Sequence, residues 1–162
     1  MTASIKQIEK STEIIAHYTL LASATGAVPV PASSVAIVAE NGIMLAHVAE
    51  ALGIESITIS TVVSSMGVAG SLNLLGRAVF IEGAKLLSWG TGSFWTATLL
   101  MALGASTAGV QTYIIGRLAV EIGKNHGKAL KGHKGRNVIA DAKTNYDAFV
   151  SYWKSKKIAE PV

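Results

Sequence analysis

Two histidines and two glutamates provide the first candidate chemistry in this sequence. His17 and His47 fall on two consecutive helical segments, and Glu40 and Glu50 flank His47 on either side. If these segments pack together, the two histidines could meet, and Glu40 or Glu50 could complete a metal site. The spacing matches no recognised ligand pattern, however, and hydrogen-bonded or exposed histidines are far more common. We therefore predict no bound metal, and the absence of cysteine excludes thiolate sites.

Glycine is abundant, but no glycine cluster forms a nucleotide-binding loop. Three clusters lack the lysine and the strand–loop–helix setting that a phosphate loop requires. They are Gly67-x-x-Gly70, Gly90-x-Gly92 and Gly104-x-x-x-x-Gly109. The Gly-x-Ser-x-Gly pattern of hydrolases does not occur either. These glycines are better suited to turns and helix packing, and we predict a protein that is not an enzyme and needs no cofactor.

Charge is divided unevenly along the 162 residues. Up to Gly116 there are four basic and six acidic residues, a net charge of −2, whereas the remainder has ten basic and four acidic residues, a net charge of +6. The basic tract follows the most hydrophobic segment, as the cytoplasmic flank of a membrane helix does. No aromatic residues are interleaved with its lysines to stack on bases, which argues against nucleic acid. We predict anionic lipid as the partner, with solubilisation as the alternative. The expected headgroup contacts are Arg117, Lys124, Lys128, Lys131, Lys134 and Arg136.

The first apolar run is interrupted by two prolines. Ile14–Ala39 contains 26 residues without a formal charge, enough to cross a bilayer, for which about 20 apolar residues suffice. Pro29 and Pro31 cannot donate hydrogen bonds to helix carbonyls, and they push the preceding residues into extended conformations. We therefore predict two antiparallel helices joined by a turn, over roughly Ile14–Ala24 and about Ala32–Leu52.

The second of these helices is predicted to be amphipathic. Asn41 falls within its apolar stripe, where the side chain needs a hydrogen-bond partner. The stripe is expected to contain Val38, Leu45, Val48 and Leu52, opposite Glu40, His47 and Glu50.

A second helical hairpin is predicted downstream. An uncharged run over Ser56–Gly76 continues as a helix to about residue 87, and Gly90 and Gly92 shape the following turn. The next helix, Phe94–Ile115, is long and apolar enough to span a bilayer unaided. Two small residues on one face of it, Ala105 and Gly109, favour close contact between helices.

The character of the sequence changes after residue 122. Residues 123–140 form a basic Gly/Lys-rich tract that we predict to be a solvated linker, with His126 and His133 inside it. Asp141–Lys157 then shows helical spacing of apolar and aromatic residues with lysines beside them. Such a face suits a membrane interface, and it suits packing on the protein's own core equally well. The face consists of Ala142, Tyr146, Phe149, Val150 and Trp153.

These blocks, taken in order, resemble a known family. It is the small hydrophobic domain of unknown function that follows the GTPase domain in a group of bacterial Era-like GTPases and recurs in some bacterial inner-membrane proteins. The matching segments are IIAHYTLLASATGAVPVP, NGIMLAHVAEALGIE, and LGRAVFIEGAKLL with SWGTG and a helix ending YIIGR. Ser33 and Ser34 replace an acidic residue of the family pattern, and Ser88 replaces a proline. The resemblance implies an all-helical, membrane-associated module without a reaction of its own, and it raises a GTPase as a partner.

We predict an all-α fold of two helical hairpins rich in small residues, followed by a C-terminal amphipathic helix. Residues 1–122 are expected to form the hairpin domain, 123–140 the linker, and 141–162 the C-terminal helix and tail. The predicted function is a non-enzymatic scaffold or anchor that self-associates or docks a partner at the bacterial inner membrane, with both termini cytoplasmic. The alternatives are a pore whose polar path exposes Glu40, Asn41 or Arg77, and a soluble cytoplasmic assembly that buries its apolar faces between copies.

Overall fold

The computed structural model describes residues 3–28, 33–67 and 94–156. These residues are helical or form connections between helices, and no strand occurs among them. The prediction of an all-α fold is therefore confirmed. Four long helices are α1 (Ile5–Gly26), α2 (Ser33–Leu52), α4 (Phe94–Lys124) and α5 (Lys134–Lys154), and residues 59–67 are helical as well.

Helix α1 begins nine residues earlier than the predicted Ile14. The reason is a capping box: the Ser4 N–H donates to Gln7 Oε1 at 2.8 Å, and the Gln7 N–H donates to Ser4 Oγ at 3.3 Å. This pair satisfies two backbone donors at the helix start. The first two turns of α1 carry exposed charged residues. The predicted helix began later because it was placed on the uncharged run alone.

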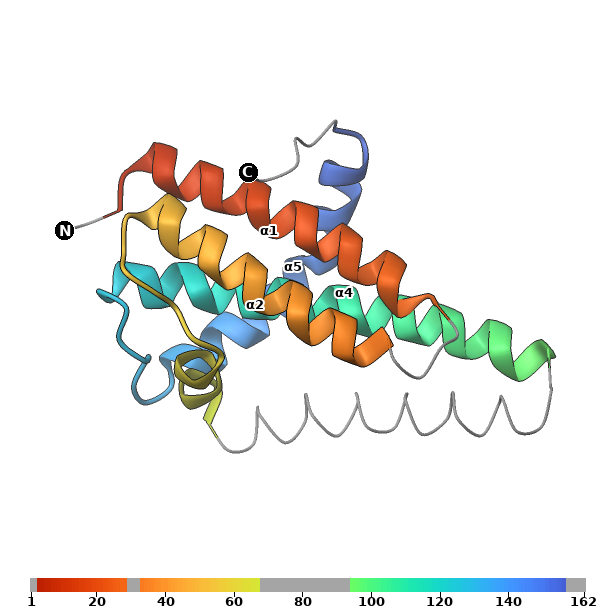
Figure 1. Ribbon diagram of the computed structural model, residues 1–162. Helices are drawn as coiled ribbons and strands as arrows, with labels where there is room; N and C mark the ends of the chain where they lie inside the picture. The colour runs from red at the N-terminus through yellow and green to blue at the C-terminus, as the bar shows by residue number, and fades with distance from the viewer. Residues whose placement is uncertain (1–2, 29–32, 68–93, 157–162) are drawn as a thin grey trace.

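Helices α1 and α2 are separate and run antiparallel, as the two prolines predicted (Figure 1). Helix α1 ends at Gly26, where the N–H of Ala27 donates to the carbonyl of Ser23, and α2 begins at Ser33. Pro29 and Pro31 themselves lie outside the described residues, as do the predicted turn residues Gly90 and Gly92. The 26-residue uncharged run is thus divided between two helices.

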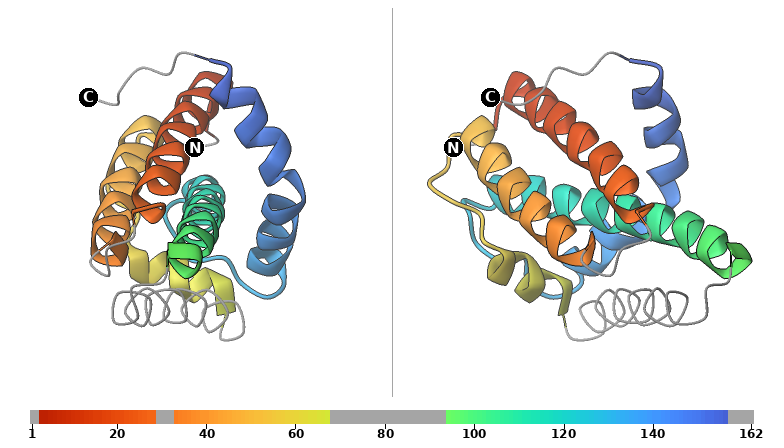
Figure 2. Two further views of the ribbon diagram at one scale, coloured as in Figure 1. Left: turned by 90° about the vertical axis from the view of Figure 1, so that its right-hand side faces the viewer. Right: turned by 45° about the vertical axis from the view of Figure 1, so that its right-hand side comes forward.

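The helices are arranged with α1 and α4 in the middle and with α2 and α5 on opposite sides (Figure 2). Helices α1 and α4 run antiparallel, whereas α2 and α4 run in the same direction (Figure 1). In the left view of Figure 2, α4 is seen nearly end-on while α5 is seen along its length, so α5 crosses the bundle. The core between these elements is built mainly from Ile14, Ile15, Met44, Leu45, Val48, Tyr113, Ile114, Leu118 and Ile122.

Three glycines spaced seven residues apart bring α4 close to its neighbours. A Cβ at Gly109 would collide with the hydroxyl groups of Ser23 and Tyr146, and a Cβ at Gly123 would collide with Leu52. At Gly116 a Cβ would lie 2.7 Å from both Cγ atoms of the buried Ile15. A seven-residue period keeps residues on one side of a helix. The stripe therefore faces α1 and α5 at Gly109, α1 at Gly116 and α2 at Gly123.

The connection between α4 and α5 is exposed over most of its length, but it is docked on the protein at one point, Leu130. The N–H of Leu130, which is buried, donates to Ser65 Oγ at 3.0 Å. Gly135 lies so close to the carbonyl of Ser65 that any side chain would collide with it. Helix α5 begins at Lys134, seven residues before the predicted Asp141. Its first turn packs through Gly135 on Ser65, a contact that the apolar stripe of the later turns does not indicate.

Substitution of two glycines by alanine should have opposite effects on stability. A Cβ added at Gly42 in α2 would have no atom within 4 Å, so Gly42→Ala should raise the free energy of unfolding by about 0.5–1 kcal/mol through helix propensity. Gly116→Ala should lower it by about 1–3 kcal/mol, because Ile15 is fully packed and must move. Chemical unfolding followed by circular dichroism measures both. A stabilising Gly116→Ala would contradict the close contact of α1 and α4.

Candidate functional site

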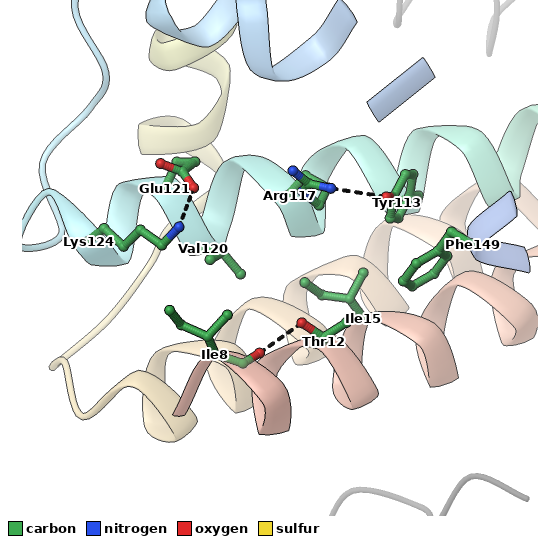
Figure 3. A pocket seen from close by; sticks show the side chains of 9 residues that line it. All are labelled: Ile8, Thr12, Ile15, Tyr113, Arg117, Val120, Glu121, Lys124 and Phe149. Atoms are coloured by element: carbon green, nitrogen blue, oxygen red, sulfur yellow. Dashed lines mark hydrogen bonds and ion pairs between the residues drawn. The ribbon is translucent and has the colours of Figure 1, made fainter. Parts of the chain in front are cut away.

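A groove of about 240 Å³ lies between α1 and α4 (Figure 3). Helix α1 provides one wall and α4 the other, and Phe149 of α5 closes one end. None of the lining residues comes from α2. The lining residues are Ile8, Thr12, Ile15, Tyr113, Arg117, Val120, Glu121, Lys124 and Phe149.

The α4 wall carries two cations, each held by an acidic partner. Arg117 donates from Nη1 to the Tyr113 hydroxyl at 3.2 Å and from Nη2 to Asp141 Oδ2 at 2.9 Å. Lys124 Nζ lies 2.6 Å from Glu121 Oε1. Both cationic side chains are only about one-third exposed, at 36% for Arg117 and 37% for Lys124. They are therefore fixed at the edge of the groove instead of extending freely into solvent.

The rest of the groove is apolar and rigid. The Tyr113 and Phe149 rings are stacked, with centroids 4.3 Å apart and an angle of 30° between their planes. Ile15 and Val120 are buried beneath the groove. Thr12 adds one polar group, but its hydroxyl already donates to the carbonyl of Ile8 at 2.8 Å. The groove thus combines an apolar floor with a cationic edge.

The predicted histidine cluster forms a hydrogen-bonded pair with a tyrosine between α1 and α2. The Tyr18 hydroxyl lies 3.1 Å from His47 Nδ1, and the His17 ring meets Tyr18 edge-on at a centroid distance of 5.2 Å. Thr25 donates to Glu40 Oε1 at 2.6 Å on the same seam. Burial, and secondarily the negative charge of Glu40, raise the pKa of Tyr18 above its ordinary value. Tyr18 therefore remains neutral across the physiological range, and its hydroxyl shares one hydrogen bond with His47 Nδ1.

These groups do not converge as metal ligands. In the part of the chain that the structure describes, no three side chains of histidine, aspartate or glutamate come together in a group that could hold a metal ion. His17 and His47 both contact Tyr18, but Glu50 is exposed at the far end of α2. The histidines and Glu40 instead connect α1 to α2.

A layer of polar side chains crosses the core where α1, α2 and α4 meet. Thr19 and Thr112 are fully buried and Asn41 is 95% buried, since its exposed fraction is 5%. Thr19 and Thr112 each lie one helical turn from the contact between Ile15 and Gly116 on antiparallel helices. Asn41 and Thr112 each lie eleven residues, about three turns, before the contact between Leu52 and Gly123 on parallel helices. The three side chains therefore occupy one level and face the same core.

Three oxygen atoms of this layer lack hydrogen-bond partners within the described residues: Thr19 Oγ1, Asn41 Oδ1 and Thr112 Oγ1. The need of Asn41 for a partner was anticipated from the sequence, whereas both threonines were missed. The two threonines differ from other threonines of the chain only in lying at the same level on two packed helices. A single sequence does not reveal which residues of two helices lie at the same level. The second carboxylate oxygen of Glu40 is likewise buried and without a partner among the described residues.

The predicted lipid-contacting cations occupy two different environments. Lys128, Lys131, Lys134 and Arg136 are exposed on the connection before α5 and on its first turn. Arg117 differs because it braces α4 against α5 through its ion pair with Asp141. Of the predicted small contact residues on α4, Gly109 is buried against Ser23 and Tyr146, and Ala105 is half-buried.

The outward face of α2 is apolar, which the sequence pattern did not predict. Val38, placed by the pattern in the core stripe, is 58% exposed, and Val35 and Ile43 are 73% and 51% exposed. Glu40, placed by the pattern on the solvent side, is half-buried against Thr25. The assignment of these two residues was wrong because α1 covers the polar side of α2. Among the described residues, one helical segment, Val35–Leu52, has the length and composition to cross a membrane.

The C-terminal helix packs its aromatic face on the bundle. Ala142 is fully buried, and Tyr146 and Phe149 pack against Tyr113. Burial raises the pKa of the Tyr146 hydroxyl, although its hydrogen bond to Ser23 acts in the opposite direction. The core-packing alternative for this face therefore accounts for its first three residues.

Comparison with protein-family models, with curated proteins and with solved structures finds no match for this chain. The resemblance to the hydrophobic domain of the Era-like GTPases therefore stays a prediction.

Replacing the unpartnered threonines by valine should stabilise the fold. Thr19→Val and Thr112→Val keep the shape of the side chain and remove a buried hydroxyl without a partner, so each should raise the free energy of unfolding by about 1 kcal/mol. Ser11 supplies the control, because its equally buried hydroxyl donates to the carbonyl of Gln7 at 2.7 Å, and Ser11→Ala should not stabilise. Destabilisation by either valine would show that these hydroxyls are hydrogen-bonded in solution.

Proposed function

We propose that the protein is a non-enzymatic helical anchor that docks at a membrane through the end of its bundle at which α1 and α4 carry no charged residue. Glu40 of α2 also lies at this end, where it is half-buried and accepts a hydrogen bond from Thr25. The observation that carries this proposal is the distribution of charge along the helices. In α1 all charged residues lie within residues 5–13, and in α4 they lie within residues 117–124. Because α1 and α4 are antiparallel, these charged segments share one end of the bundle, and residues 14–26 and 94–116 share the other.

The uncharged length of α4 corresponds to the thickness of a bilayer. Its 23 residues before Arg117 extend about 34 Å at 1.5 Å per residue, and the hydrocarbon core is about 30 Å thick. Helix α4 projects beyond α1 and α2 at this end (Figure 1). With the uncharged end inserted, the boundary at Arg117 coincides with the membrane surface.

Helix α5 fits an interfacial position at that boundary. It crosses the bundle (Figure 2), and its Asp141 forms an ion pair with Arg117. Tyr152 is exposed, and Lys156 Nζ lies 4.4 Å from the centroid of its ring. Exposed aromatic rings and lysines on a helix that lies along a surface are typical of membrane interfaces.

The outward face of α2 supports contact between copies within the membrane. Ala39, Gly42 and Ala46 lie on this face, and nothing approaches within 4 Å of a Cβ position at Gly42. Small residues allow helices in lipid to approach closely. We therefore include self-association through α2 in the proposal, and the mass of the detergent-solubilised protein reports on it.

The depth of insertion can be measured with single cysteines, because the natural chain has none. Ser106 lies exposed on the uncharged part of α4, and Asn137 lies exposed on the first turn of α5. In isolated membranes, a water-soluble maleimide should label Asn137→Cys at least tenfold faster than Ser106→Cys, because thiolates do not form in lipid. In denaturant both should react at similar rates.

Equal labelling of both cysteines in native membranes would contradict the proposal. Alkaline carbonate washing of the same membranes provides an independent check, since an inserted bundle remains in the pellet until detergent is added. Release of a large particle of defined mass without detergent would instead support the soluble assembly that the sequence left open.

The exposed lysines before α5 should strengthen binding to anionic lipid. Lys124 and the connection that follows it lie about 10 Å along α4 from Arg117, within reach of a surface potential whose Debye length is about 8–10 Å. Lys128→Gln combined with Lys131→Gln should weaken co-flotation with phosphatidylglycerol vesicles by about thirtyfold, given about 1 kcal/mol per basic residue. The Lys→Arg pair at the same positions should bind normally. Unchanged binding of the Gln pair would refute the headgroup assignment.

A further inference from the structure

We propose that the groove between α1 and α4 binds a single acyl chain that carries an anionic headgroup. The chain would lie on the apolar floor, and the headgroup would meet Arg117 and Lys124 at the edge. This inference goes beyond the anchor function and does not rest on it, because no lining residue comes from α2 and the groove opens at the charged end of the bundle.

The apolar floor is preformed and matches a narrow hydrocarbon chain. Ile8, Thr12 and Ile15 follow one another along α1 at helical spacing, opposite Tyr113 and Val120 on α4 (Figure 3). The stacked rings of Tyr113 and Phe149 close the groove at one end, so the depth is limited. A volume of about 240 Å³ equals about eight water molecules of liquid, which suits part of one chain and excludes a two-chain lipid.

The cationic edge favours an anion over a neutral headgroup. Arg117 and Lys124 lie two helical turns apart on the same wall. Arg117 is held by Asp141, which lies outside the lining, and Lys124 is held by Glu121, which is part of it. Only one carboxylate, that of Glu121, lines the groove, so the lining has a net charge of +1. Charge-assisted hydrogen bonds to ionised oxygens are about twice as strong as neutral ones. The Tyr113 hydroxyl, which accepts from Arg117, also retains its own proton for donation.

Trp153 provides a local reporter of occupancy. Its ring centroid lies 6.2 Å from that of Phe149, which lines the groove. In a Trp89→Phe, Trp95→Phe background, Trp153 is the remaining tryptophan. Bromine quenches indole fluorescence at short range, so brominated chains entering the groove should quench it. The protein is used in the form that fractionation yields, in neutral-lipid nanodiscs or in buffer.

Four probes distinguish the contribution of the acyl chain from that of the headgroup. They are 12-bromododecanoate, 12-bromododecyl phosphate, 12-bromododecanol and inorganic phosphate. The two anionic chains should quench saturably at one per protein, and the alcohol should bind at least tenfold more weakly. Tighter binding of the carboxylate would identify a free fatty acid, and tighter binding of the phosphate would identify a phospholipid-like head. Inorganic phosphate should not displace either chain. Equal binding of the alcohol, displacement by phosphate alone, or quenching that does not saturate would each overturn the proposal.

Matched variants test the cationic edge and the apolar floor of the groove separately. Lys124→Gln should weaken the anionic probes at least fivefold and leave the alcohol unchanged, whereas Lys128→Gln, outside the groove, should have no effect. Ile8→Phe should weaken every chain by filling the floor. Because Arg117 also braces α5, Arg117→Lys is used in place of a neutral residue and should retain binding. An unaffected Lys124→Gln variant together with an unaffected Ile8→Phe variant would show that the probes bind elsewhere, and membrane insertion would remain a separate result.

Discussion

The close approach of α4 to its neighbours at Gly109, Gly116 and Gly123 is the constraint on which the arrangement of this protein depends. A side chain at Gly116 would displace the fully buried Ile15, and one at Gly109 would separate both α1 and α5 from α4. The same stripe fixes the register. A slip of one helical turn would set Ile15 against Thr112 or Val120, neither of which leaves room for it. Arg117 and Lys124 directly follow two of these glycines, so the contact that joins the helices also positions the cationic edge of the groove.

Charge segregation follows from the antiparallel arrangement. Helix α1 loses its charges after Glu13 and α4 gains them at Arg117, and the two boundaries lie at nearly the same level, because Ile15 meets Gly116. The proposed insertion of this end in lipid would account for the charge-free stretches of α1 and α4, because a charged group costs several kilocalories per mole in hydrocarbon. The apolar outward face of α2 extends this surface to one side of the bundle.

Much of the fold could be predicted from the sequence, but the faces of the helices could not. The division between α1 and α2 was predicted correctly, because a proline lacks a backbone hydrogen-bond donor and interrupts a helix locally. Val38 and Glu40 were misplaced because the side of α2 that α1 covers is decided by tertiary contacts. The start of α1 was readable from the Ser4–Gln7 capping box, and Gly116 and Gly123 from their seven-residue spacing. The groove and the docking of Leu130 on Ser65 depend on residues far apart in sequence, for which one sequence offers no signal.

Three buried polar side chains carry a cost that the close contact of the helices offsets. Thr19, Asn41 and Thr112 lie at one level just inside the boundary that Arg117 marks, where an all-apolar core would be more stable. The short side chains of Thr19 and Thr112 nevertheless occupy little volume, which the close α1–α4 contact requires one turn away from Gly116. Larger apolar residues at these positions would force the helices apart and open the glycine contacts. The benefit of small side chains at this level therefore outweighs the free-energy cost of a buried hydroxyl without a hydrogen-bond partner. Valine has the same size as threonine and lacks the hydroxyl, so it removes this cost without separating the helices.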